Sequence, residues 1–166
     1  MKKIVLGLSG GVDSAVSARL LQDQGFEVYG LYMEVGMNGS ADAVRVAQTL
    51  GIPLYIAPRQ EQFEREVCDY FAHEYQCART PNPCIVCNRK VKFETLCQYA
   101  DEIGAPYIAT GHYARIGHDA AGRALLLRAR SPKDQSYMLA NLPRTVLERC
   151  VFTLGEAADK KEVRTL

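Results

Sequence analysis

Residues 4–14 read Ile-Val-Leu-Gly-Leu-Ser-Gly-Gly-Val-Asp-Ser, a short apolar run followed by small and polar residues. A continuous apolar run that stops at a glycine pair is typical of a buried strand in a parallel sheet. From Ser14, apolar and small residues at helical spacing predict a helix that Gly25 terminates. The loop between them should therefore bind an anion, because backbone N–H groups and the helix dipole converge at such a position.

The alternation of strand and helix continues beyond this first unit. We expect a second strand over 26–33, a helix over 42–50 that ends at Gly51, and a third strand over 52–57. Such alternation predicts right-handed parallel crossovers. The fold class is therefore α/β, a layered parallel sheet with helices on both faces and with ligands outside the carboxyl ends of the strands.

The second half of the chain carries further elements. The pattern predicts helices over 61–75 and over 93–103, separated by an extended, exposed turn over 79–83 that its prolines enforce. A strand should follow over 107–110. At the C-terminal end we expect a small β-hairpin, 114–116 with 124–128, and short helices over 134–141 and 144–149.

Composition narrows the class of protein. With 166 residues, 48% hydrophobic and 23% charged, the chain resembles an ordinary globular domain. Its net charge of +1 gives no general argument for nucleic acid, although residues 115–133 are locally basic, as a solvated hairpin or a phosphate-binding patch would be. No apolar run approaches the roughly 20 residues of a membrane span, so we expect a cytoplasmic protein and no membrane partner. In that compartment the six cysteines are expected to be thiols, ligands or catalysts.

The loop over 9–14 has the chemistry of a pyrophosphate site. Gly10 and Gly11 let phosphate approach the backbone, and Ser9 and Ser14 add hydroxyl donors. Asp13 is suited to orienting Mg²⁺ or capping local amides. The chain has neither G-x-x-x-x-G-K-[ST] nor G-x-G-x-x-G. A loop without lysine that holds a leaving pyrophosphate fits attack at the α-phosphorus; a tight turn of small residues without a ligand is the simpler alternative.

A second segment, residues 79–88, reads RTPNPCIVCN and places Cys84 and Cys87 three apart at the start of a helix. Cations follow at positions 89, 90 and 92. We expect this setting to lower the pKa of Cys87 and to make it a nucleophile. The same pair also suits an iron–sulfur or metal half-site, or a redox pair, although the absence of a second C-x-x-C disfavours zinc. Cys68 and Cys97 are expected to be small core residues on helices.

Residues 9–14 resemble the PP-loop of the N-type ATP pyrophosphatases. Residues 79–93, 109–113 and 131–137 resemble, in the same order, segments of the bacterial tRNA-specific 2-thiouridylase family. The resemblance implies an adenine-nucleotide alpha hydrolase-like fold that binds ATP and Mg²⁺, with Cys87 as the catalytic nucleophile. It places the ATP contacts at Gly7, Leu8, Ser9, Gly10, Gly11, Val12, Asp13, Ser14, Met33 and Gly111. It places the tRNA contacts at Asn82, Pro83, Cys84, His112, Lys133, Asp134 and Gln135.

The resemblance also implies a reaction. In that family the C2 oxygen of the wobble uridine is adenylated, and a cysteine persulfide, loaded by a protein sulfur donor, then displaces AMP. Cys87 would release the sulfur by forming a disulfide with the persulfide cysteine. The target base would leave its stack to reach the cavity. The implied activity is that of a tRNA-uridine 2-sulfurtransferase.

The chain departs from that family pattern in three places. The persulfide cysteine and a β-barrel-like region of the family lie beyond Leu166, and Cys150 does not match that cysteine. Residues 34–42 are shorter than the acidic insertion of many members, and Cys84 replaces an aspartate found in some. We therefore expect an ATP-binding domain over 1–130, the start of a tRNA-contacting segment over 131–166, and low or no turnover by the fragment. The alternatives are a PP-loop ligase for a small molecule and a non-catalytic ATP- or iron–sulfur-binding module.

Overall fold

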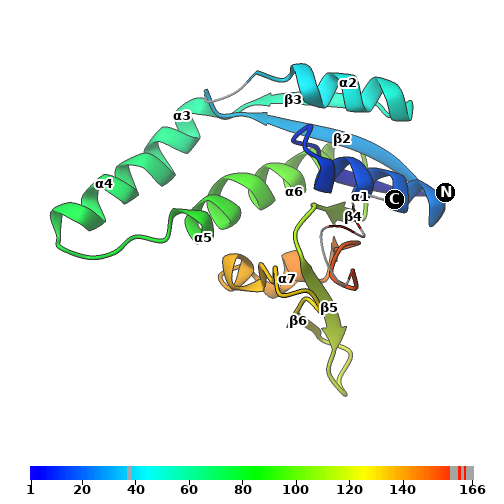
Figure 1. Ribbon diagram of the computed structural model, residues 1–166. Helices are drawn as coiled ribbons and strands as arrows, with labels where there is room; N and C mark the ends of the chain where they lie inside the picture. Colours follow the sequence, from blue (N-terminus) through cyan, green and yellow to red (C-terminus); the bar gives the residue numbers. More distant parts are fainter. Residues whose placement is uncertain (37–38, 158–160, 162, 164–166) are drawn as a thin grey trace.

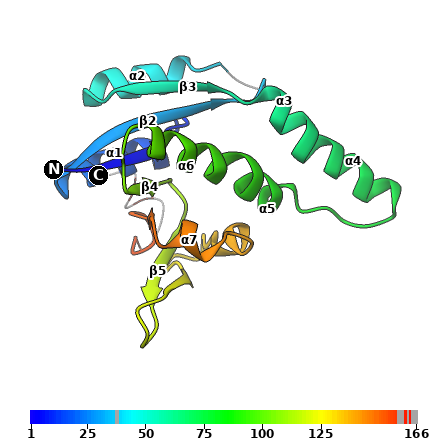
Figure 2. The ribbon, with the colours of Figure 1, turned by 180° about the vertical axis from the view of Figure 1, so that it is seen from behind.

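A five-stranded sheet forms the centre of the computed structural model, which describes residues 1–36, 39–157, 161 and 163. The strand order is β3-β2-β1-β4-β7, and every pairing is parallel (Figure 1, and from behind in Figure 2). The strands are β1 (Lys2–Gly7), β2 (Phe26–Glu34), β3 (Leu54–Pro58), β4 (Tyr107–Ala109) and β7 (Cys150–Val151). The expected layered parallel α/β fold is confirmed, with β7 as a fifth strand that the sequence did not predict.

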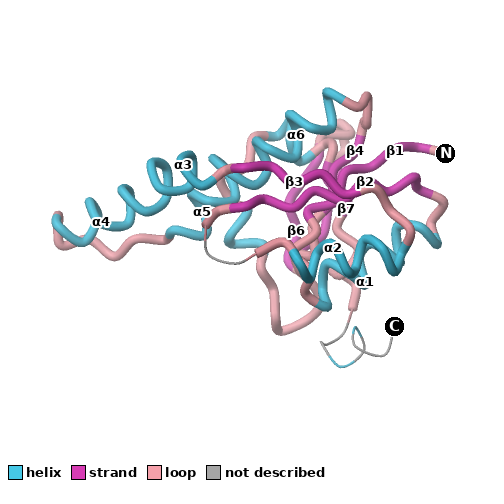
Figure 3. The backbone as a smooth tube through the Cα atoms, turned by 90° about the horizontal axis from the view of Figure 1, so that it is seen from above, coloured by secondary structure: helices cyan, strands magenta, loops and turns pink. Residues whose placement is uncertain are grey.

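Helices cover both faces of this sheet. Figure 3 shows α1 (Val12–Asp23) and α2 (Ala41–Leu50) on one side and α6 (Phe93–Glu102) on the other. The apolar run of β1 serves both layers: Ile4 and Leu6 pack in the cluster with α1 and α2, whereas Val5 packs in the cluster with α6. Burial on both faces explains why this strand is apolar throughout. No helix in the described ranges is long and apolar enough to cross a bilayer.

Two long helices extend beyond the sheet and form an arm (Figures 1 and 2). The first is built from α3 (Gln60–Phe63), a π-helical turn η1 (Glu64–Cys68) and α4 (Asp69–Gln76). The second is built from α5 (Pro83–Cys87), a π-helical turn η2 (Asn88–Lys92) and α6. The expectation that Cys68 is a core residue is wrong, because the first helix has left the sheet there and Cys68 is exposed. Cys97 was also expected to be a core residue, and it is half-buried and packs against the core.

The predicted turn between these helices ends in a defined helix start. Pro83 occupies the first helical position, where the missing N–H costs nothing. Asn82 precedes it, and its Oδ1 accepts a hydrogen bond from the N–H of Ile85 at 3.4 Å. The helix that carries Cys84 and Cys87 thus begins directly after the turn that the prolines predicted.

The C-terminal part adds small elements around the sheet. The predicted hairpin is present as β5 (Ala114–His118) and β6 (Ala124–Arg128), paired antiparallel. The helix expected over 134–141 is reduced to a 3₁₀ turn, η3 (Ser136–Leu139), and α7 (Arg144–Leu147) follows. The chain then returns to the sheet as β7 beside β4. Residues 158–160, 162 and 164–166, which belong to the segment expected over 131–166, lie outside the described residues.

Candidate functional site

The candidate site lies where the order of the strands reverses. Ile4 of β1 pairs with Val28 of β2 on one side and with Tyr107 of β4 on the other. The chain that follows β1 therefore leads to β2 on one side of β1, and the chain that follows β4 leads to β7 on the other side. Such a switch point leaves a crevice at the carboxyl ends of the strands. A cavity of about 470 Å³ occupies this position and has the size of a small-molecule site.

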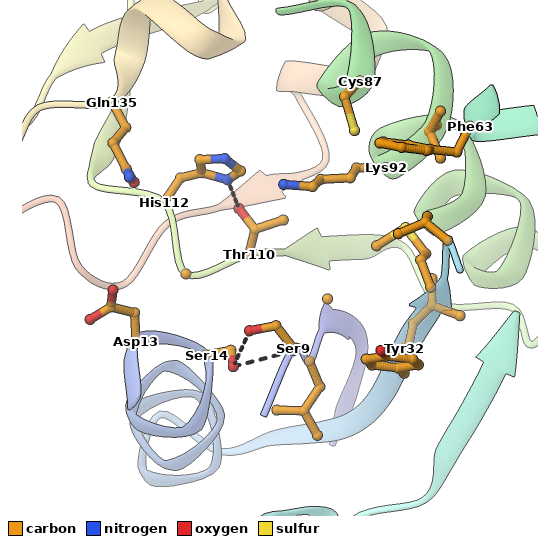
Figure 4. A pocket seen from close by; sticks show the side chains of 17 residues that line it. Ser9, Asp13, Ser14, Tyr32, Phe63, Cys87, Lys92, Thr110, His112 and Gln135 are labelled. Atoms are coloured by element: carbon orange, nitrogen blue, oxygen red, sulfur yellow. Dashed lines mark hydrogen bonds between the residues drawn. The ribbon is translucent and has the colours of Figure 1, made fainter. Parts of the chain in front are cut away.

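The loop after β1 forms one wall and is held in shape by its own hydroxyl groups. Ser14 Oγ donates to the carbonyl of Gly11 at 2.9 Å and lies 3.2 Å from Ser9 Oγ (Figure 4). The N–H of Gly11 donates to Ser9 Oγ at 3.4 Å. The expected strand–loop–helix unit is therefore present and preorganised.

The glycines beside this loop have different structural reasons. Gly10 has φ +84°, and a Cβ there would lie 2.6 Å from the backbone nitrogen of Ala43. A Cβ on Gly111 would lie 3.0 Å from the carbonyl carbon of Asp13. Gly11 is open, since the nearest atom to a Cβ would be Ser9 Oγ at 3.5 Å. The space above Gly11 is thus free to receive phosphate, whereas Gly10 and Gly111 are required by close approaches within the fold.

The segment after β4 forms the opposite wall. His112 is only 8% exposed, and its Nδ1 lies 2.7 Å from Thr110 Oγ1 (Figure 4). Burial, helped by the charge of Lys92, lowers the pKa of His112 to about 4. The imidazole is therefore neutral at pH 7 and lines the cavity as an uncharged hydrogen-bonding group.

Partly buried hydrogen bonds fix this second wall to the first. The hydroxyl of Tyr113 donates to Asp13 Oδ1 at 3.0 Å. The N–H of Tyr113 donates to Gln135 Oε1 at 3.1 Å, and the N–H of Gln135 returns a bond to the carbonyl of Tyr113 at 2.8 Å. Asp13 at the start of α1 and Gln135 near the end of the chain thus take fixed positions at one cavity.

The arm supplies the third wall, with Phe63, Cys87, Val91 and Lys92 facing the cavity. Cys87 and Lys92 point into it in Figure 4. The expectation of a lowered thiol pKa is wrong: burial raises the pKa of Cys87, and the nearby charge of Lys92 only opposes this. Cys87 is the last residue of α5, away from the first helical turn, so its half-buried position dominates.

Most of the residues expected from sequence come together here. The expected residues that line the cavity are Gly7, Leu8, Ser9, Asp13, Ser14, Met33, Cys87, Gly111, His112 and Gln135. The expected residues that do not line it are Gly10, Gly11, Val12, Asn82, Pro83, Cys84, Lys133 and Asp134. The first three belong to the loop itself, and Cys84 is exposed on the arm.

Asp134 has a structural position. Its Oδ1 accepts from the N–H of Ala129 at 2.7 Å, and its Oδ2 accepts from the hydroxyl of Ser136 at 2.8 Å. These hydrogen bonds shape the turn that presents Gln135 to the cavity. Asp134 therefore supports the site from behind, whereas its neighbour Lys133 is exposed.

Several lining residues were not expected from sequence. They are Leu31, Tyr32, Val35, Phe63, Val91, Lys92 and Thr110. Thr110 had a signal, its position directly before Gly111, whereas Phe63 and Lys92 reach the cavity from the two helices of the arm, far in sequence from the loop over 9–14. In the described ranges, no group of three or more His, Cys, Asp or Glu side chains is placed to hold a metal ion.

Comparison with known proteins gives consistent results. Residues 2–166 match the model of a family described as tRNA methyl transferase HUP domain. The tRNA-specific 2-thiouridylase MnmA of Lachnoclostridium phytofermentans is 45% identical over 183 residues, covering 100% of this chain and 51% of that protein. The tRNA-specific 2-thiouridylase MnmA of Geobacter metallireducens is 45% identical over 184 residues, covering 99% of this chain and 50% of that protein. The chain thus spans about half the length of the curated relatives it matches.

A solved structure supports the fold. The structure described as a 4-thiouridine synthetase–RNA complex with bound ATP superposes with a TM-score of 0.58 at 20% identity, covering 98% of this chain and 39% of that chain. At this level of identity the likeness concerns the fold alone. The same arrangement of sheet and helices is therefore found in proteins of distant sequence.

Proposed function

The chain belongs to the tRNA methyl transferase HUP domain family, and from this membership we propose that it is the ATP-binding part of a tRNA-specific 2-thiouridylase. The observation that carries the proposal is a single cavity at the switch point of the sheet. The phosphate-type loop over 9–14, the glycine after β4 and the thiol of Cys87 all border it. An activating nucleotide and a sulfur-handling group can therefore act on one bound base.

In this proposal the loop over 9–14 binds the pyrophosphate of ATP. Support comes from the open surface at Gly11 and from the two serine hydroxyls beside it. Asp13 is proposed to orient Mg²⁺ through its carboxylate. Met33 at the end of β2 and Gly111 after β4 border the same space and are proposed to contact the nucleoside. The proposed fit of ATP therefore depends on the shape of the cavity and on the donor groups that these residues present.

The proposed reaction transfers sulfur in two steps. The C2 oxygen of a tRNA uridine attacks the α-phosphorus, pyrophosphate leaves, and the O-adenylated base becomes reactive. A persulfide sulfur, delivered from a protein donor, then displaces AMP, and Cys87 takes part in releasing that sulfur by disulfide exchange. The reaction is proposed for the cytoplasm, where tRNA and ATP meet.

We also propose that residues 1–130 bind ATP and that residues 131–166 begin the part that contacts tRNA. Gln135 supports this division, since it lines the cavity while the neighbouring Lys133 faces solvent. His112, on the wall after β4, also lines the cavity and is a proposed tRNA contact. The remaining proposed tRNA contacts are Asn82, Pro83 and Cys84, at the start of α5, together with Lys133 and Asp134.

The test uses the full-length protein that contains this chain. Asp13→Ala should abolish ATP binding and pyrophosphate formation with tRNA, whereas Asp23→Ala, at the exposed end of the same helix, should leave both intact. Cys87→Ser should keep pyrophosphate formation and lose 2-thiouridine, and Cys97→Ser is its matched control. Mass spectrometry of tRNA from cells that lack the full-length gene gives the biological answer. Intact wobble 2-thiouridine in those cells would overturn the proposal.

The same protein tests the iron–sulfur alternative for Cys84 and Cys87. After anaerobic purification, iron and acid-labile sulfide are measured in wild type and in Cys84→Ser. Stoichiometric iron that Cys84→Ser removes would assign the pair to a cluster. Full transfer activity without iron would assign Cys87 to thiol chemistry.

A further inference from the structure

Charge in the cavity is unevenly distributed. The loop over 9–14 contains no lysine or arginine, so its binding of phosphate depends on N–H and hydroxyl donors. Among the described residues that line the cavity, Lys92 alone carries a positive side chain. A highly charged nucleotide bound there would therefore meet this one ammonium group from the side opposite the loop (Figure 4).

Lys92 reaches the cavity because its helix is locally widened. In a regular α-helix a side chain five residues after Cys87 would point about 140° away around the axis. Here η2 intervenes, and the N–H of Phe93 bonds to the carbonyl of Asn88, five residues earlier. The wider turn keeps Cys87 and Lys92 on one side of the helix, where both line the cavity. Such π-helical turns occur often at functional sites.

The widened turn is firmly anchored to the rest of the fold. Asn88 is buried, and its Nδ2 donates to the carbonyl of Met138 at 3.1 Å. Arg89 Nη1 donates to the carbonyl of Asn141 at 2.6 Å. Val91, on the same turn, is completely buried. The backbone that carries Lys92 is therefore fixed from outside the cavity, which favours a defined direction for its side chain.

The surroundings of Lys92 favour an anionic ligand. In Figure 4 its Nζ points into the space between His112 and Cys87. His112 is neutral at pH 7, and burial raises the pKa of the Cys87 thiol. In the described part of the chain, no carboxylate lies within ion-pair distance of the Lys92 ammonium group. The ammonium group of a half-buried lysine, with uncharged side chains beside it, attracts a phosphate oxygen strongly.

We propose that Lys92 is a catalytic residue that binds a non-bridging oxygen of the α-phosphate. This proposal rests on the proposed function, in which uridine O2 forms a bond to the α-phosphorus while the bond to the pyrophosphate oxygen breaks. Pyrophosphate leaves with that electron pair. Lys92 keeps its proton throughout and neutralises charge on the α-phosphoryl group, first during adenylation and then as AMP departs.

The test compares AMP with adenosine, which differ by the α-phosphate alone. Calorimetry is carried out on the full-length protein and its Lys92→Met, Lys92→Arg and Lys90→Met variants. Lys90 lies on the same turn but is exposed and does not line the cavity, so Lys90→Met is the matched control. Lys92→Met should weaken AMP about ten- to hundredfold and leave adenosine unchanged, as expected for a lost charge-assisted hydrogen bond. Lys92→Arg should recover part of the AMP affinity.

Four results would overturn the inference, and the last of them would also overturn the proposed function. Equal AMP affinity in Lys92→Met and Lys90→Met would show that the ammonium does not reach the phosphate. An equal loss for adenosine would show a merely structural role. Normal AMP affinity with weakened tRNA binding would assign Lys92 to an RNA phosphate instead. Wild-type protein that binds neither ATP nor AMP would overturn the proposed function as well, and so separates the two failures.

Discussion

Replacing Gly10 by alanine should destabilise the protein in two separable ways. The first is backbone strain, because Gly10 has φ +84°, a region that costs an L-residue about 1–2 kcal/mol. The second is steric, because the new Cβ would lie 2.6 Å from both the nitrogen of Ala43 and the Cβ of Asp42. Pushing α2 away from the loop should add about 1–3 kcal/mol, as overpacking usually does. The total loss in free energy of unfolding is therefore about 2–5 kcal/mol.

Gly25→Ala isolates the first of these terms. Gly25 has nearly the same φ, +83°, and a Cβ there would have no heavy atom within 4 Å. Both variants gain similarly from a less flexible unfolded chain, so that contribution cancels in the comparison. Urea unfolding followed by circular dichroism gives each free energy, and each kcal/mol should also lower Tm by about 2–4 °C. Equal destabilisation of the two variants would refute the claim that the loop and α2 are in contact at Gly10.

Three further predictions concern the walls of the cavity. Gly11→Ala should change the free energy of unfolding by less than about 0.5 kcal/mol, because a Cβ at this position has space. The same variant should bind ATP more weakly, as measured by calorimetry. His112 has a pKa of about 4 when folded and 6.5 as its ordinary value, so its stabilisation is present above pH 6.5 and is lost as pH falls towards 4. His112→Gln should therefore flatten urea-measured stability over this interval, by up to about 3 kcal/mol. Tyr113→Phe removes the hydrogen bond to Asp13 and should cost about 1–2 kcal/mol in the same assay.

The order of elements could be predicted from sequence because each carries its own local signal. Residues 4–8 are apolar throughout, as a strand buried on both faces must be, and Gly25 and Gly51 mark the ends of helices with positive φ. The hairpin was visible because a turn separates two short apolar runs. Each of these signals depends only on residues that are close in sequence, so it can be recognised before the fold is known.

The remaining features depend on contacts between distant segments. β7 has only two residues, Cys150 and Val151, and exists because β4 offers a free edge. Lys92 lies at the cavity because a π-helical turn, held by the carbonyls of Met138 and Asn141, changes its direction. The pKa of Cys87 was predicted in the wrong direction because nearby cations are visible in a sequence, whereas burial is not.

The strand order also fixes when the cavity can form as the chain is synthesised. β1 and its loop leave the ribosome before β2, which can pair with β1 after a short helical connection. The other side of β1 must wait for β4, and Gln135 emerges later still. These late, long-range pairings are the slow kind to form. A ribosome-bound chain that ends before Tyr107 therefore has the loop over 9–14 and the arm but lacks the wall after β4, and the proposed affinity for ATP should arise only when β4 has docked.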